Sequence, residues 1–165
     1  MRIVRLAYLN IHKFLLETIG TNFGQLTIVD QFPGDDLIVL PGYETGRESE
    51  VVLPAISIEL VNILSGQNVE IGSSGVDFRA LFAVYVHALS GGQLTDVCSF
   101  IEEAMTDRCI NVYDYSGGYP GNGGEPVFSR MRFSEVNGMP LALPAKNAAL
   151  RNAGIVYFVV SLIRN

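Results

Sequence analysis

The stretch GSSGVDFRALFAVYVHAL, residues 72–89, contains the longest strand pattern of the chain and decides the fold. Between Phe78 and Val86 every second residue is apolar, which is the period of a β-strand. After Arg79, the positions in between are also largely apolar. Because a strand with two apolar faces has to be covered on both, we expect this one to lie in the centre of a sheet.

Two amphipathic helices are predicted around this strand. Residues 1–20 repeat apolar side chains at steps of three and four, and residues 94–105 do the same. A capping box precedes the second helix, with Ser90 as the N-cap and Gln93 three positions later. Further strand patterns cover residues 25–30, 53–63, 109–115, 126–136 and 154–165.

The connections between the later strands are short. The dipeptide Asn137–Gly138 is typical of a tight hairpin turn. Parallel crossovers need a dozen or more residues and usually a helix, which these connections do not provide. We therefore expect a single α+β domain over residues 1–165, with a mostly antiparallel sheet and two helices packed on one face. Exposed loops are expected near residues 41–50 and 115–127.

The composition indicates a surface that is shared with other molecules. Only 17% of the residues are charged, against about 25% in a typical domain, and the mean hydropathy is +0.30. A membrane is one explanation, but the longest apolar stretch, residues 153–163, has about half the length that a spanning helix needs. The amino terminus lacks the pattern of a signal peptide. We therefore expect an oligomer and no membrane.

The net charge and the cysteine spacing argue against two further classes of function, nucleic-acid binding and metal binding through cysteine. The net charge of −6 argues against tight binding of nucleic acid, because neutralising phosphates requires clustered lysine and arginine. The cysteines, Cys98 and Cys109, have no metal-binding spacing. Two reduced thiols in a reducing compartment are favoured over a disulfide.

The glycine-rich stretch INVYDYSGGYPGNGGEP, residues 110–126, raises the question of a phosphate site. A phosphate-binding loop of the P-loop type needs a lysine and a hydroxyl at the start of a helix, whereas here a strand pattern follows. No cofactor is expected. We interpret the stretch as a connection whose Tyr115 and Tyr119 contact a neighbouring subunit, and Tyr43 in the other exposed loop is a third candidate for this interface.

One serine and two pairs of carboxylates are candidates for catalysis. Ser90 in ALSGG resembles a nucleophile elbow, but that class places its base histidine after the serine, and both histidines, His12 and His87, precede it. Capping of the helix explains Ser90 more simply. The pairs Asp35–Asp36 and Glu102–Glu103 are sequence neighbours, which do not converge on one face of a helix or strand. We expect no catalytic residues, no metal site and no enzymatic activity.

The order of elements resembles a known family. An amino-terminal helix, LPAISIEL, FAVYVHAL, an amphipathic helix, INVYDYSGG and IVYFVVSLI look like the tail terminator and neck (head–tail joining) proteins of bacteriophages, over residues 1–163. The resemblance implies a virion protein, made in the host cytoplasm, whose copies form a ring, commonly a hexamer. Such a ring terminates the tail tube and joins it to the neck or connector proteins, and DNA passes through it without being tightly bound.

Two other functions remain open on the residues alone. A small ligand-binding or regulatory α+β module would need an apolar cavity with convergent polar groups. An enzyme would need Ser90 or a carboxylate as its reactive group. A surface that fits a second subunit, a ligand site or a set of catalytic groups would distinguish the three functions.

Overall fold

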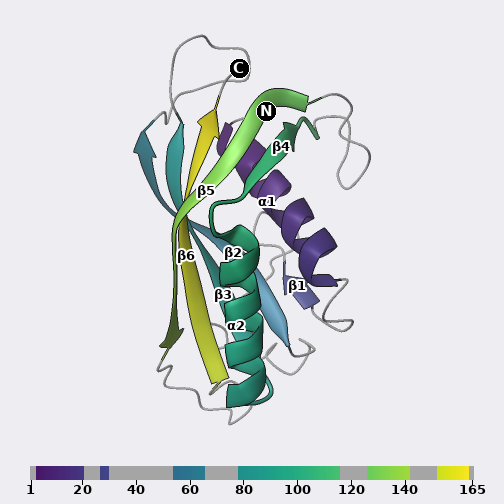
Figure 1. Cartoon of the computed structure of the whole chain (residues 1–165), viewed down its shortest axis with the longest axis vertical. Helices are drawn as coiled ribbons and strands as arrows, with labels where there is room; N and C mark the ends of the chain where they lie inside the picture. Colours follow the sequence, from purple (N-terminus) through teal and green to yellow (C-terminus); the bar gives the residue numbers. More distant parts are fainter. Residues whose placement is uncertain are drawn as a thin grey trace.

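The computed structural model describes residues 3–20, 27–29, 54–65, 78–115, 126–141 and 152–163. Within these residues, two helices lie against one face of a curled six-stranded sheet (Figure 1). In chain order the elements are α1 Ile3–Gly20, β1 Thr27–Val29, β2 Ala55–Ser65, β3 Arg79–Ala88, α2 Gly91–Met105, β4 Cys109–Tyr113, β5 Pro126–Leu141 and β6 Asn152–Ile163.

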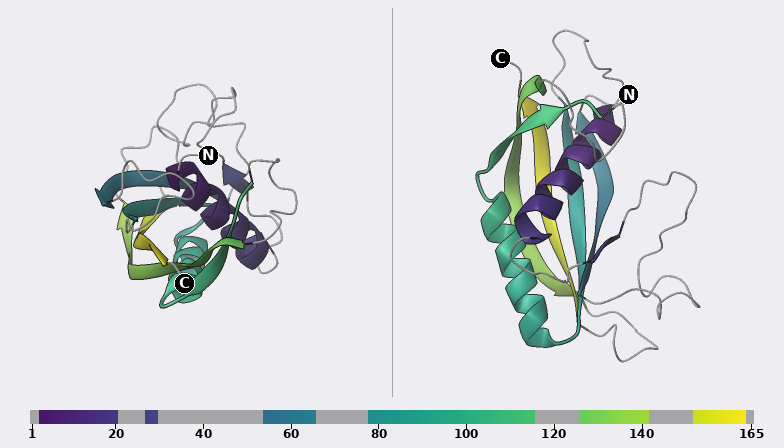
Figure 2. Two further views of the ribbon diagram at one scale, coloured as in Figure 1. Left: turned by 90° about the horizontal axis from the view of Figure 1, so that it is seen from above. Right: turned by 90° about the vertical axis from the view of Figure 1, so that its right-hand side faces the viewer.

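The strand order is β1-β2-β3-β6-β5-β4. The short β1 runs parallel to β2, and every other neighbouring pair is antiparallel. The predicted α+β fold with a mostly antiparallel sheet is therefore confirmed. The strand that decided the fold is β3, which lies between β2 and β6 as predicted. Seen from above, the sheet curls around the helices (Figure 2).

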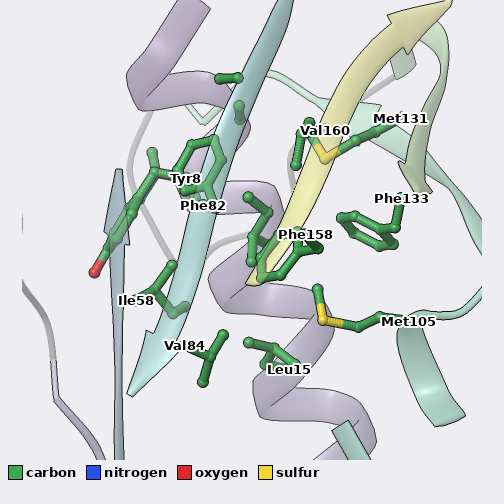
Figure 3. Close-up of a cluster of buried hydrophobic side chains, with 14 of the residues drawn as sticks. Tyr8, Leu15, Ile58, Phe82, Val84, Met105, Met131, Phe133, Phe158 and Val160 are labelled. Atoms are coloured by element: carbon green, nitrogen blue, oxygen red, sulfur yellow. The ribbon is translucent and has the colours of Figure 1, made fainter. Parts of the chain in front are cut away.

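The hydrophobic core lies between the helices and the concave side of this sheet, which we call the helix face (Figure 3). Phe82 on β3 is paired with Phe158 on β6, and their rings stack with centroids 6.1 Å apart. Phe133 on β5 meets Phe158 edge-on at 5.7 Å and reaches Phe14 of α1 at 5.6 Å. Each such aromatic pair contributes about 0.5–1.5 kcal/mol beyond the burial of its surface. This row of rings therefore ties α1 to the middle of the sheet.

The second helix begins where the capping box predicted. The Ser90 hydroxyl accepts a hydrogen bond from the Gln93 amide at 3.2 Å, and the Gln93 side-chain oxygen accepts one from the Leu89 amide at 2.8 Å. The apolar side of α2 packs on β6 at Gly154, where a Cβ atom would lie 3.0 Å from Cys98 Sγ. A larger residue would push the helix away from the sheet.

The prediction of a hairpin turn at Asn137–Gly138 is wrong, because both residues lie inside β5 and pair with β6. The irregularity falls earlier, between Ser134 and Asn137, where a β-bulge places Glu135 at a φ of 53°. The extra residue shifts the alternation by one, so Gly138 faces α2. A Cβ atom at Gly138 would overlap the Glu102 carboxylate. Gly138 therefore lies against the Glu102 side chain of α2 and forms no turn.

Candidate functional site

The residues considered for catalysis do not come together. Ser90 is exposed and holds the start of α2, whereas His87 is buried on the face of the sheet opposite the helices, which we call the far face. Neither ring nitrogen of His87 has a hydrogen-bond partner in the described structure, so no nucleophile–base pair with Ser90 forms there. Glu102 packs against Gly138, and Glu103 is exposed. Asp35–Asp36 lies outside the described residues.

Both cysteines are free thiols. Burial, with a smaller contribution from the neighbouring Glu102 carboxylate, raises the pKa of Cys98 to about 11. Cys109 is exposed at the start of β4. Among the residues that the structure describes, no group of three histidine, cysteine or acidic side chains is arranged to hold a metal ion.

The three tyrosines predicted to contact a neighbouring subunit are placed only in part. Tyr115 is 6% exposed and belongs to the hydrophobic core, and its burial raises the pKa of its hydroxyl. Its ring therefore offers little area to another chain. Tyr43 and Tyr119 lie outside the described residues, as do the loops that carry them, and their role at an interface stays a prediction.

The outer edge of β4 is capped at Tyr113 by a side chain that the sequence pattern did not point to. Asn10 of α1 is 3% exposed, and its amide nitrogen donates to the Tyr113 carbonyl at 2.9 Å. Its amide oxygen accepts a hydrogen bond from the Tyr113 amide, also at 2.9 Å. Asn10 thus takes the place of a neighbouring strand at the outer edge of β4. The available signal was an asparagine within an otherwise apolar helix face.

The opposite edge is closed over only part of its length. Strand β1 pairs with Ala55–Ser57 of β2, and no described strand lies outside residues 58–65. We call residues 58–65 the β2 edge. Val61 and Leu64 on this segment are 44% and 47% exposed. An unpaired strand edge with apolar side chains is a ready template for pairing with another chain, and native proteins usually protect such edges.

The far face contains two buried polar side chains without hydrogen bonds. Ser57 on β2 and His87 on β3 are each 1% exposed, and they lie diagonally across from each other in the β2–β3 register. Neither side chain has a hydrogen-bond partner in the described structure. Burial lowers the pKa of His87, so its ring is neutral at pH 7. A buried polar group left without a partner costs about 1–3 kcal/mol.

Comparison with known proteins adds no relative. No protein-family model matches the chain, and the search of curated proteins gives no significant match. In the part of the chain that the structure describes, neither helix is long and apolar enough to cross a membrane.

Proposed function

We propose that this chain is a structural virion protein of a phage head–tail junction, whose copies form a ring that terminates the tail tube and joins it to the neck. The observation that carries the proposal is the β2 edge. No described strand pairs with its outer side beyond Ser57, and Val61 and Leu64 are exposed there, as on a strand that takes part in subunit contacts. The assignment to a virion rests on the resemblance in the order of elements.

The contrast between the two sheet edges supports self-association. On β4, the Asn10 amide occupies the backbone groups of Tyr113 and leaves them unavailable to another strand. On the β2 edge, two register shifts distort the strand, and no described strand lies on the outer side of residues 58–65. A chain with 17% charged residues also has little polar surface with which to keep such an edge solvated.

The partners follow from this proposal. The ring contacts the tail tube on one side and the neck or connector proteins on the other, and DNA passes through it without tight binding. The chain needs no cofactor for this role, because it acts only by binding its own copies and the neighbouring virion proteins.

The experiment is electron microscopy of the purified protein, combined with light scattering after size-exclusion chromatography. The expected result is ring-shaped particles with a central hole and a mass that is a whole multiple of 18.0 kDa. A monomer at every concentration would contradict the proposal. Deleting residues 117–124, between β4 and β5, should leave the circular dichroism of the fold intact while ring formation or tail joining fails.

A small ligand-binding module is the second candidate, and the unpaired Ser57 and His87 favour it. A bound polar molecule would supply the hydrogen bonds that these two side chains lack. Native mass spectrometry of the purified protein tests this function. A small-molecule adduct that is present in the wild type and absent from Ser57→Ala and His87→Phe would support it, whereas a bare polypeptide mass would not.

A further inference from the structure

Three arginines gather on the far face at one end of the sheet. Arg79 on β3 and Arg132 on β5 are both in register with Ser161 of β6, which lies between them. Arg130 is two residues from Arg132 and points to the same face. All three side chains are exposed. We call them the arginine patch.

The patch carries excess positive charge in an acidic protein. Glu135 of the β5 bulge contacts it, with a carboxylate 3.6 Å from the Arg79 guanidinium in an exposed ion pair. Among the described residues, no ion pair neutralises Arg130 or Arg132. Arginine is the basic residue best suited to bind carboxylates at an interface, because its planar fork donates two parallel hydrogen bonds.

A complementary acidic surface exists on the other side of the same subunit. Helix α2 has no lysine or arginine over Gly91–Met105, and its side facing away from the sheet carries the exposed Asp96 and Glu103. Asp107 follows in the turn after the helix and is also exposed. Since α2 packs on the helix face and the arginines alternate to the far face, this acidic side and the arginine patch lie on opposite faces of the sheet.

The spacing of the charges agrees on the two surfaces. Arg79 and Arg132 stand two strands apart, which places their Cα atoms about 10 Å from each other. Asp96 and Glu103 are seven residues apart on a helix, which is two turns and also about 10 Å along its axis. The two arginines on either side of β6 can therefore each contact one of the two acidic residues on α2.

We propose that the arginine patch binds the acidic side of α2 of a second copy of this chain. The contact joins two different surfaces, so each subunit uses its patch toward one neighbour and its helix toward the other. Head-to-tail contacts of this kind generate rings when the rotation between subunits closes. This inference rests on the proposed ring function and adds a second subunit contact to the one proposed for the β2 edge.

A nucleic acid backbone is the other anion that arginines bind. Tight binding of phosphates requires many basic contacts, whereas this patch holds three arginines, one of them paired with Glu135, on a chain of net charge −6. The acidic helix of a second copy offers matched spacing as well as charge. The second copy is therefore the favoured occupant, and DNA binding is an outcome of the test.

The test is a charge swap that uses the full chain. One variant reverses the patch with Arg79→Glu and Arg132→Glu, and a second reverses the helix with Asp96→Lys and Glu103→Lys. A third variant combines all four changes. Each variant is compared with the wild type by analytical ultracentrifugation, and circular dichroism verifies that it is folded. Arg5→Glu and Glu17→Lys on α1 are the controls, because they reverse exposed charges outside both surfaces.

Each single reversal should raise the apparent dissociation constant of the oligomer at least about 100-fold, since it juxtaposes like charges. The combined variant should recover assembly, and so should an equimolar mixture of the two single reversals. The controls should assemble like the wild type. Raising the salt concentration from about 0.1 M to about 1 M should weaken the wild-type oligomer, because the Debye length falls from about 10 Å to about 3 Å.

The outcomes separate this inference from the proposed function. If both reversal variants form rings like those of the wild type, the charge contact is wrong, whereas the proposed ring function still holds. Failure of the combined variant to recover assembly also overturns it. A wild type that stays monomeric overturns both proposals. Loss of binding to labelled duplex DNA in the patch reversal, with an unchanged oligomer, would assign the patch to nucleic acid instead.

Discussion

Replacing Asn10 should open the β4 edge and destabilise the fold. In Asn10→Leu, a side chain of similar size loses the hydrogen bonds to the amide and the carbonyl of Tyr113, both of 2.9 Å. Each backbone group left without a partner costs about 1–3 kcal/mol, and the lower half of that range applies because Tyr113 is only part-buried. The third bond of Asn10, to the Leu6 carbonyl at 2.9 Å, is lost as well.

The expected net loss is smaller than the sum of these terms. A buried leucine regains about 1 kcal/mol through its apolar surface, so we expect the free energy of unfolding to fall by about 2–3 kcal/mol. For a domain of this length, each kcal/mol lowers Tm by about 2–4 °C. Urea unfolding at one fixed protein concentration measures the change, and amide hydrogen exchange reports specifically on the Tyr113 N–H, which should lose its protection.

Asn10→Asp tests the same hydrogen bonds through pH. A neutral carboxyl group can donate to the Tyr113 carbonyl and accept from its amide, as asparagine does, whereas a carboxylate can only accept. The folded state therefore raises the pKa of this aspartate above its usual value of about 3.9. The corresponding stability is present below that value and is lost as the pH rises through the folded pKa. The variant should approach the wild type in acid and fall below it at pH 7.

The matched control is Asn111→Leu, which makes the same substitution at an exposed position of β4 itself. It should change the free energy of unfolding by no more than about 0.5 kcal/mol. The reasoning is refuted if Asn10→Leu is as stable as the wild type, if Asn111→Leu is equally destabilising, or if Asn10→Asp shows the same deficit at every pH.

Three further predictions concern packing, titration and thiol reactivity. Gly138→Ala should lower the free energy of unfolding by no more than about 1 kcal/mol, because the Glu102 carboxylate that its methyl group overlaps ends a flexible side chain and can change rotamer. The loss should shrink when Glu102→Ala is combined with it, and additive losses in this double-mutant cycle would contradict the overlap. Because burial lowers the pKa of His87, the unfolded chain binds more protons, and stability should fall as the pH drops below about 6.5, by up to about 1.4 kcal/mol per unit. This slope should be absent in His87→Phe, and an unchanged slope would assign it to other groups. Iodoacetamide should alkylate the exposed Cys109 quickly and Cys98, with its thiol pKa of about 11, slowly, and mass spectrometry showing equal rates would refute the difference.

The local pattern of the chain determined most of the elements and the fold class. Both helices, the central strand β3 and the start of α2 at Ser90 follow from features that lie within a few residues of one another, namely apolar periodicity and a capping box. Such features act through the backbone conformation of short segments, so they are visible without knowledge of the rest of the chain. The mostly antiparallel sheet was predicted from short connections, but the hairpin at Asn137–Gly138 that supported this prediction lies inside β5.

Only the tertiary structure decided which residues meet. The register of three strands brings Arg79 and Arg132 to either side of Ser161, and the packing of α1 places Asn10 on Tyr113, 103 positions away in the sequence. Gly138 shows the same limit, because its dipeptide with Asn137 predicts a turn while the folded chain places it inside β5 against the Glu102 side chain of a distant helix. Contacts between distant segments depend on register and helix placement. No local pattern records these, so the candidate surfaces of this protein emerged only from the folded chain.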